Sequence, residues 1–201
     1  KQKGQFILTG STVMDDEEIM HTGTGRISKM AMYPMSLFES LESNGTISLQ
    51  HLFKQPDYDI DGETSQLTIE RLIFAACRGG WPASLDEMST NATLLIAKDY
   101  VDVICDKDIS RVDKTRRNPA LARLILRSYA RNICTLAKKT SMLADVAQEM
   151  GGTSMPTFES YVEALEKLFV IDDIKAWSPA IRSKTAIRSG KKRCFVDPSI
   201  A

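Results

Sequence analysis

Three side chains near the start of the sequence are of the types that phosphate chemistry uses. Thr9 and Ser11 are hydroxyl residues at the end of the short apolar run Phe6–Leu8, and Arg26 directly follows Gly25. In open α/β sheets ligands bind at the carboxyl ends of strands, so polar residues that end such a run are expected to face a ligand. A hydroxyl can orient water or touch a terminal phosphate, and a guanidinium can neutralise charge that develops there. These three residues are therefore candidates for a phosphate-contact or sensor site.

Each of these candidates also has a structural explanation. Thr9 and Ser11 can satisfy the backbone of a sharp turn at Gly10. Arg26 can be a surface or ion-paired arginine at the start of a strand. The residues alone favour the structural explanation, and the phosphate role stays open as the alternative.

The elements that would position these residues are a strand at Phe6–Leu8, a second strand at Ile27–Tyr33 and a short helix. Ser36 can cap that helix, and Glu39, three residues later, would complete a capping box. Asn44-Gly45 should end the helix. The front of the chain thus predicts part of an α/β sheet.

The rest of the chain predicts helices joined by turns. Another short turn or helix is expected at residues 48–53, followed by a polar loop. Gly79-Gly80-Trp81-Pro82 predicts a turn, because paired glycines relax the backbone and proline fixes the exit. Apolar residues at helical spacing predict helices at Leu67–Ala76, Ala83–Asp106 and Pro119–Leu136.

The last third of the sequence predicts a helix–turn–helix with a wing. One helix should end at Gly151-Gly152, and Pro156 occupies a favoured first-turn position of the next. Val170-Ile171 and Cys194–Val196 would form the two strands of the wing. Asp197 is assigned to formation of the turn that ends the wing.

A basic stretch between residues 182 and 193 could contact nucleic acid, because cations that neutralise phosphates supply most non-specific affinity. The exposed stripe of the second helix is acidic, however, with Glu159, Glu163 and Glu166. We therefore expect the winged helix to contact protein, within the same molecule or in a partner, with DNA binding as the second interpretation; the stretch could also be a solvated hairpin. The candidate nucleic-acid-binding residues are Arg182, Lys184, Arg188, Lys191, Lys192 and Arg193.

Composition places the chain among ordinary globular proteins. Hydrophobic residues make up 43% and charged residues 26% of its 201 residues, and the formal net charge is +0. No apolar run is long enough to predict a membrane span. The four cysteines are widely spaced and only two histidines are present, so no metal site is predicted and reduced cysteines in the cytoplasm fit best.

Several short motifs together resemble those of a family of bacterial predicted ATPases of the AAA+ superfamily. The resemblance covers almost the whole chain. Its motifs are Leu8–Ser11, Gly25-Arg26, Pro34–Ser40, Gly79–Pro82, Ser128–Asn132, the residues Thr157, Tyr161, Leu165 and Glu166, and Asp197–Ser199.

The resemblance implies that the polar tip at Thr9 and Ser11 corresponds to the sensor-1 position of these ATPases, with Arg26 acting in its own subunit or on a neighbour's nucleotide. It also implies that the family's phosphate loop and magnesium-holding strand lie upstream of Lys1 and that another domain follows Ala201. No Gly-x-x-x-x-Gly-Lys-Ser/Thr loop occurs in the sequence. We therefore expect a piece of a longer ATPase that requires ATP and Mg²⁺, and we expect this chain alone to be inactive.

The expected fold is an α/β remnant of a P-loop sheet at residues 1–45, a helical region at 46–135 and a winged helix at 136–201, mostly helical overall. The expected function is to couple nucleotide state to a C-terminal effector. The alternative is a winged-helix module of a regulatory protein that binds DNA or protein. The expected partners are the missing phosphate-loop segment of the same protein and a further protein; DNA is a weaker candidate, and no membrane is expected.

Overall fold

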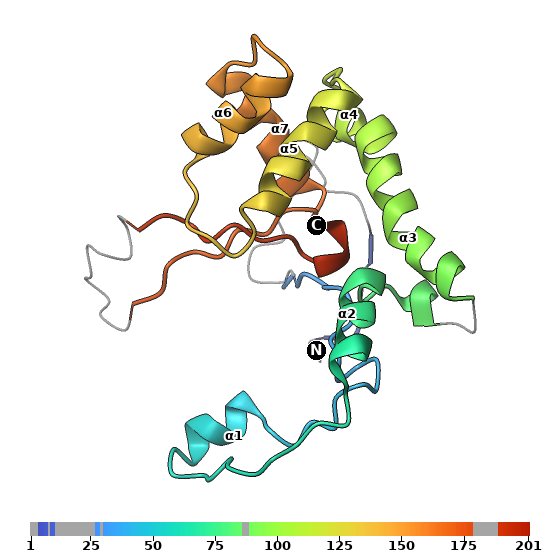
Figure 1. Cartoon of the computed structure of the whole chain (residues 1–201), viewed down its shortest axis with the longest axis vertical. Helices are drawn as coiled ribbons and strands as arrows, with labels where there is room; N and C mark the ends of the chain where they lie inside the picture. The colour runs from blue at the N-terminus through green and yellow to red at the C-terminus, as the bar shows by residue number, and fades with distance from the viewer. Residues whose placement is uncertain (1–3, 8, 11–26, 29, 86–88, 179–188) are drawn as a thin grey trace. The chain divides into compact units, whose positions relative to one another are not determined.

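A computed structural model shows that the described part of the chain is mostly helical, as expected (Figure 1). The description covers residues 4–7, 9–10, 27–28, 30–85, 89–178 and 189–201. These residues fall into two compact units. Unit 1 comprises the described residues of Lys1–Met32, Asp102–Val196 and Ala201, and unit 2 comprises those of Tyr33–Val101 and Asp197–Ile200. None of the described helices is both long and apolar enough to cross a membrane.

Helix α2 (Ile69–Arg78) of unit 2 begins at a local capping signal. The hydroxyl of Thr68 accepts a hydrogen bond from the Arg71 N–H at 3.3 Å and so caps α2. The elements of unit 2 are α1 (Leu49–Lys54), α2 (Ile69–Arg78), η2 (Pro82–Leu85), most of α3 (Thr90–Val103) and η4 (Pro198–Ile200). The short 3-10 helix η4 lies against α2 (Figure 1).

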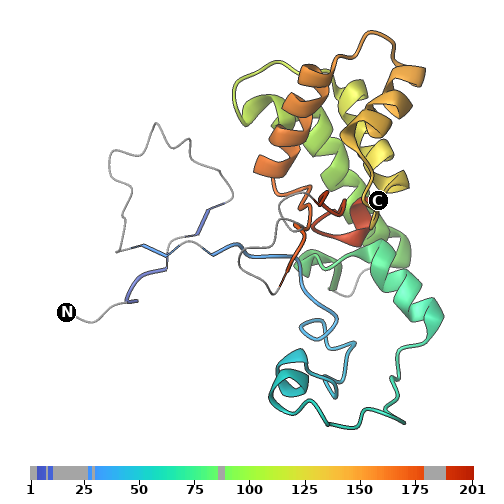
Figure 2. The same cartoon turned by 90° about the vertical axis from the view of Figure 1, so that its left-hand side faces the viewer.

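Unit 1 is built on three helices that pack on one another. Each of the helices α5, α6 and α7 contacts the other two, and the three lie side by side in both views (Figures 1 and 2). Asn118 caps α5 ahead of Pro119, and Ser154 caps α7 ahead of Pro156. The elements are a π-helical turn η3 (Ile104–Asp108), α4 (Ile109–Arg111), α5 (Pro119–Arg131), α6 (Lys139–Glu149) and α7 (Met155–Lys167).

The core of unit 1 comes from the facing sides of these helices. Each large apolar side chain that is fully buried contributes roughly 1.5–3 kcal/mol to stability. The largest fully buried side chains include Tyr129, Phe158, Ile109, Ile125, Met142 and Leu165. The core of unit 1 is therefore spread over α4, α5, α6 and α7.

The two segments expected to form a wing do pair with each other. Ile171 and Phe195 form an isolated antiparallel bridge, and Ile174 and Lys192 form a second. The Ile174 and Lys192 N–H groups each donate to the other's carbonyl, at 2.9 and 2.8 Å. The pairing is limited to these single bridges in the described residues.

The prediction of buried strands at Phe6–Leu8 and Ile27–Tyr33 is wrong for the described parts of those segments. Residues 4–7 and 30–33 have no strand assignment, and their side chains are exposed. A strand needs a neighbour whose backbone completes the hydrogen-bond ladder, and an apolar run alone does not supply one. The α/β part of the expected fold is therefore absent from the described residues.

The capping box at Ser36 is present, but it closes a single turn instead of opening a helix. The Ser36 N–H donates to the Glu39 carboxylate at 2.8 Å, and the Glu39 N–H donates to the Ser36 hydroxyl at 3.4 Å. Leu41 then adopts a φ of 61°, and the Glu42 N–H reaches back to the Leu37 carbonyl at 2.8 Å. This is a helix-terminating hydrogen bond, so the segment is capped at both ends of one turn.

The paired glycines form the expected turn, and their small size is required there. Gly79 has a φ of 77°, and a Cβ on it would lie 2.5 Å from the Asp197 carboxylate. A Cβ on Gly80 would lie 2.7 Å from the Met35 nitrogen and would overlap the Met35 carbonyl group. The backbone of residues 34–36 and the Asp197 side chain can approach this turn only because both residues are glycine.

We predict that Gly80→Ala lowers the free energy of unfolding by at least about 2 kcal/mol, because the added methyl group separates Met35 from the turn. Urea denaturation followed by circular dichroism measures the change. Gly151→Ala is the matched control, since nothing lies within 4 Å of its Cβ position, and it should change stability by less than about 0.5 kcal/mol. Equal stability of the two variants would contradict the packing described for the turn.

Candidate functional site

Of the three residues predicted to contact phosphate, the structure describes only Thr9. Thr9 lies in an irregular segment with its side chain exposed. Ser11 and Arg26 lie outside the described residues, so their placement beside Thr9 stays a prediction.

The basic stretch is divided in the same way. Arg182, Lys184 and Arg188 are outside the described residues, whereas Lys191 and Lys192 are exposed. The Lys191 ammonium lies 3.7 Å from the Glu166 carboxylate on α7. The acidic stripe of α7 therefore attracts part of the basic stretch within unit 1.

Among the three described basic residues of this stretch, Arg193 differs because its guanidinium is buried. Its side chain is 8% exposed and forms an ion pair with Asp173, whose side chain is 2% exposed. Its Nε donates to the Ala137 carbonyl at 3.0 Å, and its guanidinium lies over the Tyr129 ring. Burial, together with the Asp173 charge, raises the pKa of Tyr129. Arg193 thus holds the paired segments on α5 instead of facing solvent.

The best-organised site in unit 2 is formed where three of the resemblance motifs meet. The Met35 N–H donates to the Gly80 carbonyl at 2.7 Å, and the Gly80 N–H donates to the Asp197 carboxylate at 2.8 Å. Asp197 is buried and also accepts hydrogen bonds from Ser199, from its N–H at 2.9 Å and from its hydroxyl at 2.6 Å. The assignment of Asp197 to turn formation is confirmed, and the same carboxylate also binds a turn 117 residues away.

Trp81 makes further contacts that hold the Gly79–Trp81 turn in place. Its indole N–H donates to the Ser199 hydroxyl at 2.9 Å, and its ring packs against Tyr100 with centroids 4.5 Å apart. The Trp81 carbonyl accepts from the Ser84 hydroxyl at 2.6 Å. Polar groups of Gly80 and Trp81 are therefore satisfied by partners from three other segments of unit 2, at Met35, Ser84 and Asp197–Ser199.

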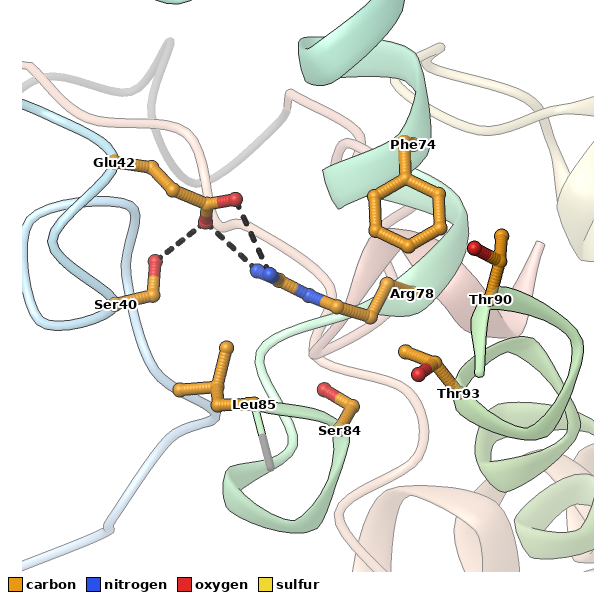
Figure 3. Close-up of a pocket in the computed structure, with 8 residues that line it drawn as sticks. All are labelled: Ser40, Glu42, Phe74, Arg78, Ser84, Leu85, Thr90 and Thr93. Atoms are coloured by element: carbon orange, nitrogen blue, oxygen red, sulfur yellow. Dashed lines mark hydrogen bonds and ion pairs between the residues drawn. The ribbon is translucent and has the colours of Figure 1, made fainter. Parts of the chain in front are cut away.

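Beside the turn lies an open pocket of about 400 Å³ (Figure 3). Arg78 reaches from the end of α2 toward Glu42, and Thr90 and Thr93 lie on the first turns of α3. The lining residues are Ser40, Glu42, Phe74, Arg78, Ser84, Leu85, Thr90 and Thr93. The pocket is therefore lined mainly by hydroxyl groups and one ion pair.

The ion pair between Arg78 and Glu42 is the main electrostatic feature of the pocket. The two guanidinium Nη atoms donate to the two carboxylate oxygens at 3.1 and 2.8 Å, and the side chains are 9% and 23% exposed. Burial raises the pKa of Glu42, but hydrogen bonds from Arg78 and Ser40 outweigh it, so the pKa lies below its usual value. Glu42 is thus held as a carboxylate that neutralises Arg78.

Three of the hydroxyl groups that line the pocket donate hydrogen bonds to other groups of the protein. Ser40 donates to Glu42 at 2.7 Å, Ser84 donates to the Trp81 carbonyl, and Thr93 donates to the Ser89 carbonyl at 3.2 Å. These oxygens offer lone pairs to a ligand, and Arg78 offers donors once Glu42 is displaced. In the portion of the chain that the structure describes, no cluster of three or more His, Cys, Asp or Glu side chains could hold a metal ion.

The Arg78–Glu42 pair was not identified from the sequence. The two residues are 36 positions apart, and neither belongs to a pattern that distinguishes a buried charge from a solvated one. The only local signal is the position of Arg78 directly before Gly79-Gly80. Such a pair is visible only after the segments that carry it have been placed together.

We predict that Arg78 and Glu42 are energetically coupled. In a double-mutant cycle of Arg78→Gln and Glu42→Gln, each single variant leaves one buried charge without its partner, so the coupling should be about 1–3 kcal/mol. The exposed pair Arg127 and Glu149, with side chains 67% and 51% exposed, is the control and should couple by less than about 0.5 kcal/mol. Urea denaturation of the variants measures both values; equal couplings would show that burial adds nothing to the Arg78–Glu42 pair.

Comparison with known proteins identifies one family. Searches of curated proteins and of solved structures gave no match. Residues 69–201 match the family described as "Domain of unknown function (DUF8612)", and this match includes the Gly79–Pro82 turn and Asp197 but not Thr9 or Arg26. The match covers more than half of the chain, and the chain therefore belongs to the DUF8612 family.

Proposed function

We propose that this chain is the effector-side portion of an AAA+-type ATP-binding protein, which couples nucleotide state to a C-terminal module. The observation that carries the proposal is the junction of Met35, Gly80 and Asp197 in unit 2. These residues belong to three separate motifs of the ATPase resemblance, and hydrogen bonds join the three motifs directly. Such convergence supports reading the motifs as one inherited unit instead of three chance matches.

The front of the chain would supply the second half of the ATPase domain. In the described residues, Phe6, Ile7, Met30 and Met32 are exposed apolar side chains in segments without helix or strand. Exposed apolar segments of this kind gain stability when they join a sheet whose neighbouring strands complete their hydrogen bonds. The phosphate loop, ATP and Mg²⁺ would come with the upstream segment, and Thr9, Ser11 and Arg26 would face the terminal phosphate.

The C-terminal module of this proposal is a winged helix that contacts protein. Three packed helices followed by two paired segments support this assignment. On α7, Glu159 pairs with Lys139 at 3.0 Å and Glu166 lies 3.7 Å from the Lys191 ammonium, whereas Glu163 is exposed. These carboxylates neutralise cations that a phosphate backbone would need, which favours a protein partner over DNA. We place this function in the cytoplasm, because Cys77, Cys105, Cys134 and Cys194 form no disulfide in the structure.

The first test of the proposal is ATP hydrolysis by the complete natural gene product. We expect hydrolysis that requires Mg²⁺, with turnover lowered at least tenfold by Arg26→Ala and with little change in stability. The control is Arg111→Ala, because Arg111 is exposed and forms only a 3.8 Å contact with Asp108. If Arg26→Ala and Arg111→Ala turn over ATP equally fast, Arg26 has no role in phosphate chemistry; absence of any hydrolysis or ATP binding would reject the ATPase assignment.

The second test separates the protein-contact module from a DNA reader. We predict that the chain shows no duplex binding that weakens steeply with salt, because the α7 carboxylates neutralise cations that a phosphate backbone would need. Fluorescence anisotropy with a labelled duplex at several salt concentrations measures this. Duplex binding that falls with salt, and that is lost in Lys191→Gln/Lys192→Gln but not in the control Lys98→Gln/Lys107→Gln, would instead establish the DNA-binding alternative.

A further inference from the structure

Two cysteines that are 60 positions apart in the sequence meet in unit 1. The Cys134 N–H donates to the carbonyl of Arg193, the residue before Cys194, at 2.8 Å. The Arg193 N–H donates in turn to the Thr135 carbonyl at 2.9 Å. These two hydrogen bonds hold the backbones of Cys134 and Cys194 side by side.

The thiol groups of the two residues also interact. Burial raises the pKa of the Cys194 thiol, and the neighbouring Cys134 thiol raises it further through its charge and a side-chain hydrogen bond. Cys134 is exposed, whereas Cys194 is half-buried. A small oxidant can therefore reach Cys134 first, with Cys194 positioned behind it.

The backbone around both cysteines is fixed before any bond forms between them. Cys134 has a φ of 60°, a left-handed conformation that is uncommon for residues other than glycine. The Cys194 N–H donates to Asp173 at 3.3 Å, and Asp173 also forms the buried ion pair with Arg193. The backbone segments that carry the two thiols are therefore held together by hydrogen bonds in the reduced protein.

We propose that Cys134 and Cys194 form a reversible disulfide that fastens the paired segments of unit 1 to the connection between α5 and α6. The oxidant is a small disulfide such as glutathione disulfide. The Cys134 thiolate attacks one of its sulfur atoms and releases one glutathione thiolate, which leaves a mixed disulfide on Cys134. The Cys194 thiolate then attacks the Cys134 sulfur and releases the second glutathione thiolate. Two protein thiols are oxidised, one disulfide is reduced to two thiols, and the two protons pass to the glutathione thiolates.

The other two cysteines provide internal comparisons. Cys105 is fully buried, so a small oxidant cannot reach its thiol and it should stay reduced. Cys77 is exposed like Cys134, but no structural feature places a second thiol beside it in the described residues. Cys77 is therefore expected to form at most a mixed disulfide.

The disulfide would close a loop of about 60 residues that contains α6 and α7. Restriction of such a loop in the unfolded chain should raise the thermal midpoint of the oxidised protein by roughly 5–15 °C. Reduction would reverse the shift. Oxidation would thus rigidify the connection that carries the paired segments.

The experiment incubates the protein with glutathione redox buffers, blocks remaining thiols, and maps disulfides by mass spectrometry of proteolytic peptides without reduction. The expected result is a single intramolecular Cys134–Cys194 cross-link, reversed by dithiothreitol, with the rise in thermal midpoint. Cys77→Ser should keep both effects, and Cys134→Ser should lose both; Cys194→Ser serves the same purpose if Cys134→Ser does not fold. Persistent glutathione on Cys134 or disulfide-linked dimers through Cys134 would overturn the proposal.

Discussion

The hydrogen bond between the Gly80 N–H and the Asp197 carboxylate is the contact on which the organisation of unit 2 depends. A buried carboxylate is costly unless hydrogen bonds replace its water, and Asp197 receives three, one from Gly80 and two from Ser199. A buried N–H is similarly costly without an acceptor. Each group therefore satisfies the other, and this requirement holds the last residues of the chain against a turn far away in the sequence.

Other features of unit 2 follow from the position of that turn. The Gly80 carbonyl accepts a hydrogen bond from the Met35 N–H. This bond brings the capped turn at Ser36 and the carboxylate of Glu42 toward the end of α2. Arg78, the last residue of α2, can then pair with Glu42 and line the pocket. The pocket thus results from backbone hydrogen bonds between short segments more than from a large apolar core. The polar character of the pocket comes from the Arg78–Glu42 ion pair and from the hydroxyl groups that line it.

Local signals predicted much of the helical structure. Apolar residues at helical spacing predicted α2 and α5, and Pro156 predicted the first turn of α7. The caps at Thr68, Asn118 and Ser154 also act within a few residues, but they were identified only in the structure. The strands at Phe6 and Ile27 were not predicted correctly, because a strand depends on a partner that an apolar run does not specify. The Arg78–Glu42 pair and the distant role of Asp197 were missed for the same reason: their partners are 36 and 117 residues away.

The most direct measurement of the central contact is amide hydrogen exchange at Gly80 and Met35, followed residue by residue by NMR. Our account predicts that both amides exchange as slowly as those inside α2, and that Asp197→Ala removes the protection of both together while leaving α5 and α7 protected. Rapid exchange of the Gly80 amide in the wild-type protein, at the rate of an exposed loop, would contradict the account.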